Sequence, residues 1–130
     1  MAGIYIHIPL CKQKCTYCDF HFSTTFHSYR SKMISSLIQE IELQKEYLKG
    51  KAIETIYFGG GTPSLLTIDE LNQILSKIHS TFNTENLLEV TLEANPDDIN
   101  TEVVQAWKSI GVNRLSIGLQ SFKESDLKWM

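Results

Sequence analysis

The stretch ETIYFGGGTPSLLTIDELNQILSKI, residues 54–78, decides the fold because it contains one strand, one loop and one helix in succession. Its first part is rich in β-forming residues and is broken by three glycines and a proline, which predicts a strand that ends in a tight loop. Thr67 and Glu70 have the spacing of a capping box, which marks a helix start. Apolar residues then recur at helical spacing, at Ile68, Leu71, Ile74, Leu75 and Ile78.

Upstream of this unit, the same alternation of strand and helix is predicted. Three isoleucines alternate with Tyr5 and His7 and the run stops at Pro9, which predicts a strand over 4–8. Apolar residues at helical spacing predict a helix over about 28–49, with Gly50 as its stop.

Downstream, two more units follow. LLEVTLEANP, residues 87–96, predicts a third strand, and Asn100 and Gly111 bracket a third helix. RLSIGLQ, residues 114–120, predicts a fourth strand, and Ser121 with Glu124 predicts a second capping box. Alternating units of this kind form a parallel sheet with right-handed crossovers. A sheet that stops at a fourth strand has an uncovered edge. We therefore expect an α/β fold, a partial βα barrel, with residues 1–130 as the N-terminal part of a longer domain.

Composition excludes several classes of protein. The chain has 130 residues, of which 42% are hydrophobic and 21% charged, as in globular domains. The net charge of −3 argues against a general nucleic-acid binder. The sequence has no run of about 18 apolar residues and no pattern of a signal peptide, so neither a transmembrane segment nor secretion is predicted. An odd number of cysteines then favours a reducing, cytoplasmic setting.

All three cysteines fall within LCKQKCTYCDF, residues 10–20, at Cys11, Cys15 and Cys18. Three buried small side chains are one explanation, although the residues between them are polar. A structural zinc site is a second, with His7, His21 or Asp19 as the fourth ligand. An iron–sulfur cluster is the third: three thiolates leave one iron of a cubane without a protein ligand. Lys12 and Lys14 would then help to offset the cluster's negative charge.

The spacing C-x3-C-x2-C, with the aromatic Tyr17 before Cys18, resembles the signature of the radical SAM superfamily. This resemblance implies a [4Fe-4S] cluster whose open iron binds S-adenosylmethionine (SAM), on a full or partial βα barrel. It implies Cys11, Cys15 and Cys18 as cluster ligands. It also places a further set of residues near the cofactors, namely Tyr5, Tyr17, Gly60, Gly61, Thr62, Glu93 and Gln120.

Each of these residues also has a purely structural interpretation. The glycines of GGGTP suit a tight connection as well as the close approach of a ligand. Glu93 can be a solvated carboxylate at a strand end or an acceptor for ribose hydroxyls. Tyr5 can be an ordinary strand aromatic.

The fuller pattern narrows the resemblance. It runs through Y-x-H-I-P-x-C-x3-C-x-Y-C, YFGGGTPS, LEANPDD and RLSIGLQSF, and it is similar to the oxygen-independent coproporphyrinogen III oxidase group. True oxidases of that group tend to carry another cysteine two residues after the third ligand, where this chain has Phe20. The departure favours the HemW-like heme chaperones. Heme would be the cargo, and an electron donor and a heme-recipient protein the partners. SAM-dependent oxidative decarboxylation of a porphyrinogen is the alternative.

Overall fold

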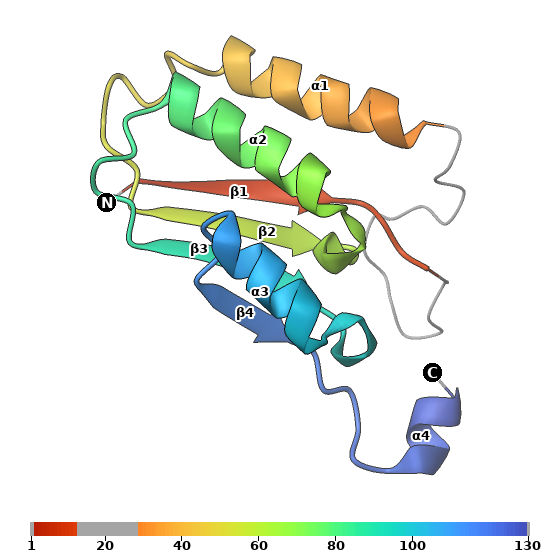
Figure 1. Cartoon of the computed structure of the whole chain (residues 1–130). Helices are drawn as coiled ribbons and strands as arrows, with labels where there is room; N and C mark the ends of the chain where they lie inside the picture. The colour runs from red at the N-terminus through yellow and green to blue at the C-terminus, as the bar shows by residue number, and fades with distance from the viewer. Residues whose placement is uncertain (1, 13–28, 130) are drawn as a thin grey trace.

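The computed structural model describes residues 2–12 and 29–129, which form one four-stranded parallel sheet in the order β1-β2-β3-β4 (Figure 1). The strands are β1 (Gly3–Ile8), β2 (Thr55–Gly60), β3 (Glu89–Ala94) and β4 (Arg114–Ile117). Each strand pairs in parallel with the next one along the chain. This is the arrangement of part of a βα barrel, and it confirms the predicted fold class.

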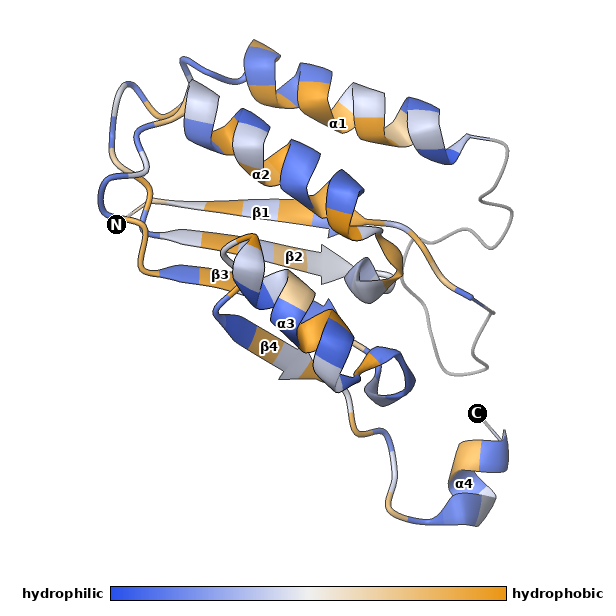
Figure 2. Ribbon diagram, in the orientation of Figure 1, coloured by the Kyte–Doolittle hydropathy of each residue, from blue (hydrophilic) through white to orange (hydrophobic). Residues whose placement is uncertain are grey.

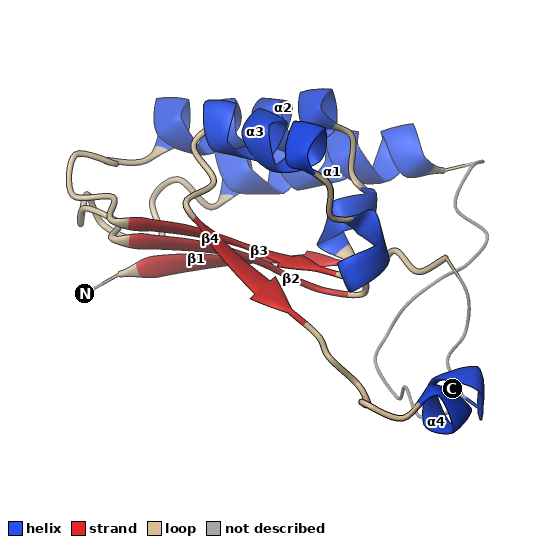
Figure 3. Cartoon of the chain, turned by 60° about the horizontal axis from the view of Figure 1, so that its bottom comes forward, coloured by secondary structure: helices blue, strands red, loops and turns tan. Residues whose placement is uncertain are grey.

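Three helices cover one face of this sheet, as Figure 3 shows from the side. They are α1 (Arg30–Leu43), α2 (Ile68–Thr81) and α3 (Thr101–Ser109), and α1 packs against α2. Short 3-10 turns, η2 (Pro63–Leu65) and η3 (Pro96–Asp98), follow β2 and β3. The last helix, α4 (Glu124–Trp129), lies apart from the sheet and buries none of its side chains. None of the described helices is long and apolar enough to cross a membrane.

The two faces of the sheet differ in character because side chains alternate along each strand. The even-numbered positions of β1, β2 and β3 meet the helices, and Ile8, Ile56, Phe58 and Leu92 are fully buried there. Figure 2 shows the apolar residues that recur along the strands and along α2. The other face, which we call the inner face, carries the alternate and largely polar positions. They are Tyr5, His7, Thr55, Tyr57, Gly59, Glu89, Thr91, Glu93, Arg114 and Ser116.

Two predicted helix starts are confirmed in atomic detail. The Glu70 N–H donates to Thr67 Oγ1 at 3.2 Å, and the Thr67 N–H donates to Glu70 Oε2 at 2.8 Å, which completes the capping box of α2. Asn100 caps α3 by accepting from the Val103 N–H at 2.9 Å. In both cases the capping partner lies three residues along the chain, and the pattern located the start of the helix.

Several boundaries differ from the sequence prediction. Helix α1 ends at Leu43, six residues before the predicted last helical residue at position 49, and successive hydrogen-bonded turns follow. Residues 42–47 are all exposed, so packing does not prolong the helix. Strand β4 ends at Ile117 rather than at residue 120. The second capping box is wrong, because Ser121 Oγ accepts from the Lys123 N–H and donates to Asp126.

A part-buried ion pair joins the starts of α1 and α2. Arg30 donates to both carboxylate oxygens of Glu70, at 2.7 and 2.5 Å, and to the Leu65 carbonyl at 2.6 Å. The hydrogen bonds from Arg30 hold the pKa of Glu70 below its usual value. Glu70 therefore caps its own helix and anchors the residue with which α1 begins.

We predict that Arg30→Met lowers the free energy of unfolding by about 2 kcal/mol at pH 7, the scale of hydrogen bonds to a charged group. Because the folded pKa of Glu70 is depressed, its contribution is complete above the unfolded value of about 4.3 and is lost as the pH falls through the folded pKa. Denaturant unfolding at pH 7 and pH 3 checks this. Wild type should lose more stability than Arg30→Met across that range. Lys32→Met, at an exposed position of the same helix, is the control and should lose as much stability as wild type. Equal losses of stability in Arg30→Met and Lys32→Met between pH 7 and pH 3 would contradict the prediction.

Candidate functional site

The carboxyl ends of the four parallel strands lie at one edge of the sheet, where α/β proteins bind ligands. Half-buried Cys11 follows β1, and Glu93 lies near the end of β3. Residues 59–62, which we call the glycine loop, span the end of β2. Gln120 lies three residues beyond β4, exposed and in a loop rather than on the predicted strand. Cys15, Tyr17, Cys18 and Phe20 fall outside the described residues.

Backbone hydrogen bonds fix the stem of the cysteine motif to the glycine loop. The Gly61 N–H donates to the Ile8 carbonyl at 2.7 Å, and the Thr62 N–H donates to the Leu10 carbonyl at 2.5 Å. Ile8 and Leu10 are buried, so the chain that leads to Cys11 has a packed base. The pairing of β1 with β2 thus continues past the last residue of each strand.

The three glycines are required by the protein's own side chains and backbone. A Cβ on Gly59 would lie 2.9 Å from the rings of both Tyr5 and Tyr57. Gly60 has a φ of +108°, and a Cβ there would lie 2.6 Å from the His7 ring. A Cβ on Gly61 would lie 2.5 Å from the Leu10 carbonyl oxygen. The tight-connection interpretation therefore accounts for all three.

This arrangement also determines what the glycine loop can offer a ligand. The N–H groups of Gly60, Gly61 and Thr62 donate within the protein, to Glu93, Ile8 and Leu10 respectively. The Thr62 hydroxyl accepts from the Asn95 amide at 3.3 Å. The loop therefore suits a ligand with donor groups, such as an ammonium, which its carbonyl oxygens can accept.

Glu93 is held on the inner face by two donors. Tyr57 Oη donates to Glu93 Oε1 at 2.7 Å, and the Gly60 N–H donates to Glu93 Oε2 at 3.2 Å. The hydrogen bond to Glu93 raises the pKa of Tyr57, so the phenol keeps its proton at neutral pH. A carboxylate has about four acceptor positions, so this one keeps capacity for a further donor such as a ribose hydroxyl.

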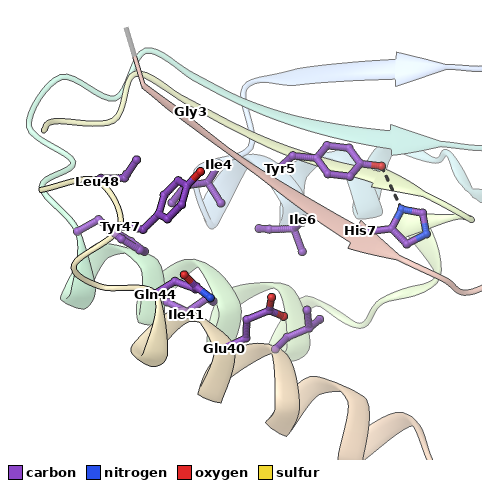
Figure 4. Close-up of a pocket in the computed structure, with 12 residues that line it drawn as sticks. Gly3, Ile4, Tyr5, Ile6, His7, Glu40, Ile41, Gln44, Tyr47 and Leu48 are labelled. Carbon is purple, nitrogen blue, oxygen red and sulfur yellow. Dashed lines mark hydrogen bonds between the residues drawn. The ribbon is translucent and has the colours of Figure 1, made fainter.

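Two aromatic side chains, from β1 and β2, lie beside one another on the inner face next to this carboxylate. The rings of Tyr5 and Tyr57 are stacked, with centroids 6.0 Å apart and planes at 24°. Burial, and then the charge of Glu93, raises the pKa of Tyr5. Tyr5 Oη and His7 Nδ1 are 3.2 Å apart, a hydrogen bond between alternate positions of β1 (Figure 4).

A pocket of about 580 Å³ lies between β1 and α1, and Figure 4 shows the residues that line it. Glu40 of α1 lines it on one side together with Gln44 and Tyr47, which follow the helix, and residues 3–7 of β1 line it on the other. This pocket runs along β1 and shares Tyr5 and His7 with the candidate site.

Several side-chain contacts at this edge of the sheet were not predicted from the sequence. Tyr57 has the same alternation as Tyr5 and could have been found by extending the strand pattern across the sheet. Lys12 forms an ion pair with Asp98 of η3, and Ser64 of η2 donates to the same carboxylate. Lys12 was expected to offset the charge of a cluster, but its ammonium is paired with a carboxylate of the protein.

The donor set is compatible with the cofactors that the cysteine spacing implied. A thiol on a packed stem suits iron, and the glycine loop and Glu93 present acceptors to the ammonium and hydroxyl groups of SAM. Among the described residues, no three His, Cys, Asp or Glu side chains gather as a metal site. Cys11 is the described member of the predicted ligand set.

We predict that Gly60→Ala destabilises the fold by about 1–3 kcal/mol more than Gly111→Ala, the scale of overpacking a filled site. Both glycines have positive φ, +108° and +103°, so both variants suffer backbone strain. A Cβ at Gly111 meets nothing within 4 Å, whereas one at Gly60 meets the His7 ring. Urea unfolding of the two variants measures the difference, and equal values would mean that the His7 ring moves aside freely.

Comparison with known proteins agrees with this geometry. Residues 5–130 match the model of the radical SAM superfamily. The chain is 36% identical to the heme chaperone HemW of Escherichia coli, covering 97% of this chain and 34% of that protein. It is 39% identical to the heme chaperone HemW of Lactococcus lactis, covering 95% of this chain and 32% of that protein. The chain thus spans about a third of the length of these curated relatives.

A solved structure shows the same fold. It is described as coproporphyrinogen III oxidase (HemN) from Escherichia coli, a radical SAM enzyme, with a TM-score of 0.86 and 26% identity. The match covers 97% of this chain and 29% of that one. The chain therefore belongs to the radical SAM superfamily, in the HemN-like group and near the HemW proteins.

Proposed function

We propose that this chain is the N-terminal part of a radical SAM core that binds a [4Fe-4S] cluster through Cys11, Cys15 and Cys18. The observation that carries the proposal is the convergence of Cys11, the glycine loop and Glu93 at one edge of the sheet. When bound, the cluster and SAM together supply one-electron chemistry. A reducing, cytoplasmic setting suits such thiolate ligands.

The residues of the chain then have distinct tasks at this edge. The carbonyl oxygens of the glycine loop would accept hydrogen bonds from the ammonium of SAM, because the N–H groups of the loop already donate within the protein. Glu93, oriented by Tyr57, accepts from ribose hydroxyls. Thr62 and Gln120 add polar contacts, and Tyr5 and Tyr17 supply aromatic surface beside the cofactors.

For the whole protein we propose heme capture and delivery. The two relatives cited above are described as heme chaperones, and Phe20 replaces the cysteine expected of a decarboxylating oxidase. Heme would be the cargo, a heme-recipient protein would take it up, and an electron-donor protein would reduce the cluster.

A second candidate function follows from the structural match. The HemN structure shares this fold, so oxidative decarboxylation of coproporphyrinogen III is the alternative. An oxidase converts coproporphyrinogen III into a different compound, whereas a chaperone releases its heme unaltered. Analysis of the products therefore separates the two functions.

The first test is anaerobic reconstitution of the chain with iron and sulfide. We expect about four irons per chain, the content of one cubane cluster, and a paramagnetic spectrum of the reduced protein that changes on addition of SAM. Alanine in place of Cys11, Cys15 or Cys18 should abolish the signal, whereas Ser76→Ala on the exposed face of α2 should not. One tightly held zinc without a response to SAM would overturn the assignment.

The second test separates chaperone from enzyme, and it uses the full-length protein that carries this chain. The chaperone proposal predicts stoichiometric heme binding, transfer of that heme to an apo-acceptor, and no conversion of coproporphyrinogen III. Absorption spectra follow the heme and chromatography follows the porphyrins. Formation of protoporphyrinogen coupled to SAM cleavage would establish the oxidase instead.

A further inference from the structure

Three loops at the carboxyl edge of the sheet meet at one carboxylate. Lys12, directly after Cys11, forms an ion pair with Asp98 Oδ1 at the end of η3. Ser64 Oγ, in η2, donates to Asp98 Oδ2 at 2.7 Å. The residues that follow β1, β2 and β3 are therefore joined through Asp98.

This carboxylate is more enclosed than its partner. The Asp98 side chain is 10% exposed, whereas that of Lys12 is 58% exposed. Asp98 accepts charge-assisted and neutral hydrogen bonds from two donors, which restrict its position. The lysine side chain is longer and more exposed, so Asp98 sets the position of the ion pair. A second hydrogen bond also joins η3 to η2, because the amide of Asn95 donates to Thr62 Oγ1 at 3.3 Å.

The pairing has an electrostatic consequence for the neighbouring thiol. A free ammonium next to Cys11 would favour every more negative state of a metal centre bound there. With Asp98 in contact, the ammonium and the carboxylate form a pair with no net charge. Their combined field at the centre is weaker than that of either group alone.

We propose that Asp98 is a positioning residue for the iron–sulfur centre: it tethers the stem that carries Cys11 through Lys12, and it neutralises the lysine charge beside the cluster. The charge part of this statement rests on the proposed function, whereas the tether is a property of the chain without metal. Removing Asp98 therefore has two separable effects, a looser stem and an exposed positive charge.

The tether is tested on the metal-free chain by amide hydrogen exchange. The Thr62 N–H donates to the Leu10 carbonyl, so its exchange rate reports whether the stem stays closed. In Asp98→Asn we expect exchange at Thr62 to be about threefold faster, the fold-change that an exposed ion pair can supply. Asp97→Asn removes an exposed carboxylate from the neighbouring residue and is the matched control. Equal rates in the two variants would overturn the tether.

The charge effect is tested on the reconstituted protein through the reduction potential of the cluster. Asp98→Asn should raise the potential, because the ammonium of Lys12 is no longer neutralised and stabilises the reduced form. Lys12→Met should lower it, because the carboxylate remains alone. The double variant removes both charges, so its potential should return towards the wild-type value while exchange at Thr62 stays fast.

The outcomes separate the two parts of the proposal. Identical potentials in all four proteins would overturn the charge effect, even where the tether is confirmed. If wild type assembles no cluster, the proposed function fails together with the charge effect. The exchange rates then still decide whether Asp98 holds the stem.

Discussion

The hydrogen bonds from Gly61 and Thr62 to the carbonyls of Ile8 and Leu10 are the constraint on which the candidate site depends. They continue the β1–β2 pairing beyond the strands and hold two loops side by side. Such close approach needs a residue without Cβ, because one on Gly61 would lie 2.5 Å from the Leu10 oxygen. The glycine run therefore places the Cys11 stem before any ligand arrives.

The polar inner face is the second determinant of what this sheet can do. Parallel sheets usually have both faces covered and both apolar. Here the helix face is apolar, whereas the inner face carries the Tyr57–Glu93 bond and a second polar group in which Glu89 accepts from Thr91 and Arg114. Polar side chains that bond one another across neighbouring strands suit a barrel interior that holds a polar ligand more than one filled by a hydrophobic core.

Local patterns in the sequence predicted the helices and strands, but they did not predict contacts between residues far apart in the chain. The Thr67 capping box and the Asn100 cap need partners only three residues away, and both are confirmed. The end of α1 was misplaced because apolar spacing alone does not show where packing stops. Lys12 and Asp98 are 86 positions apart, and Tyr57 and Glu93 are 36 apart. Only the parallel register brings such pairs together, so the sequence indicated the candidate residues but not the network that positions them.

The tethers at both ends of the cysteine segment bear on how a metal centre would form. Lys12 at one end is held by Asp98, and Arg30 at the other is held by Glu70 and the Leu65 carbonyl. Closing a loop costs conformational entropy that a metal must otherwise overcome when it gathers its ligands. Since the protein already fixes both ends against the turn that follows β2 and its neighbours, part of this entropic cost is met before a metal binds. The two ion pairs thus contribute to the same step, the gathering of the metal ligands, as the thiols themselves.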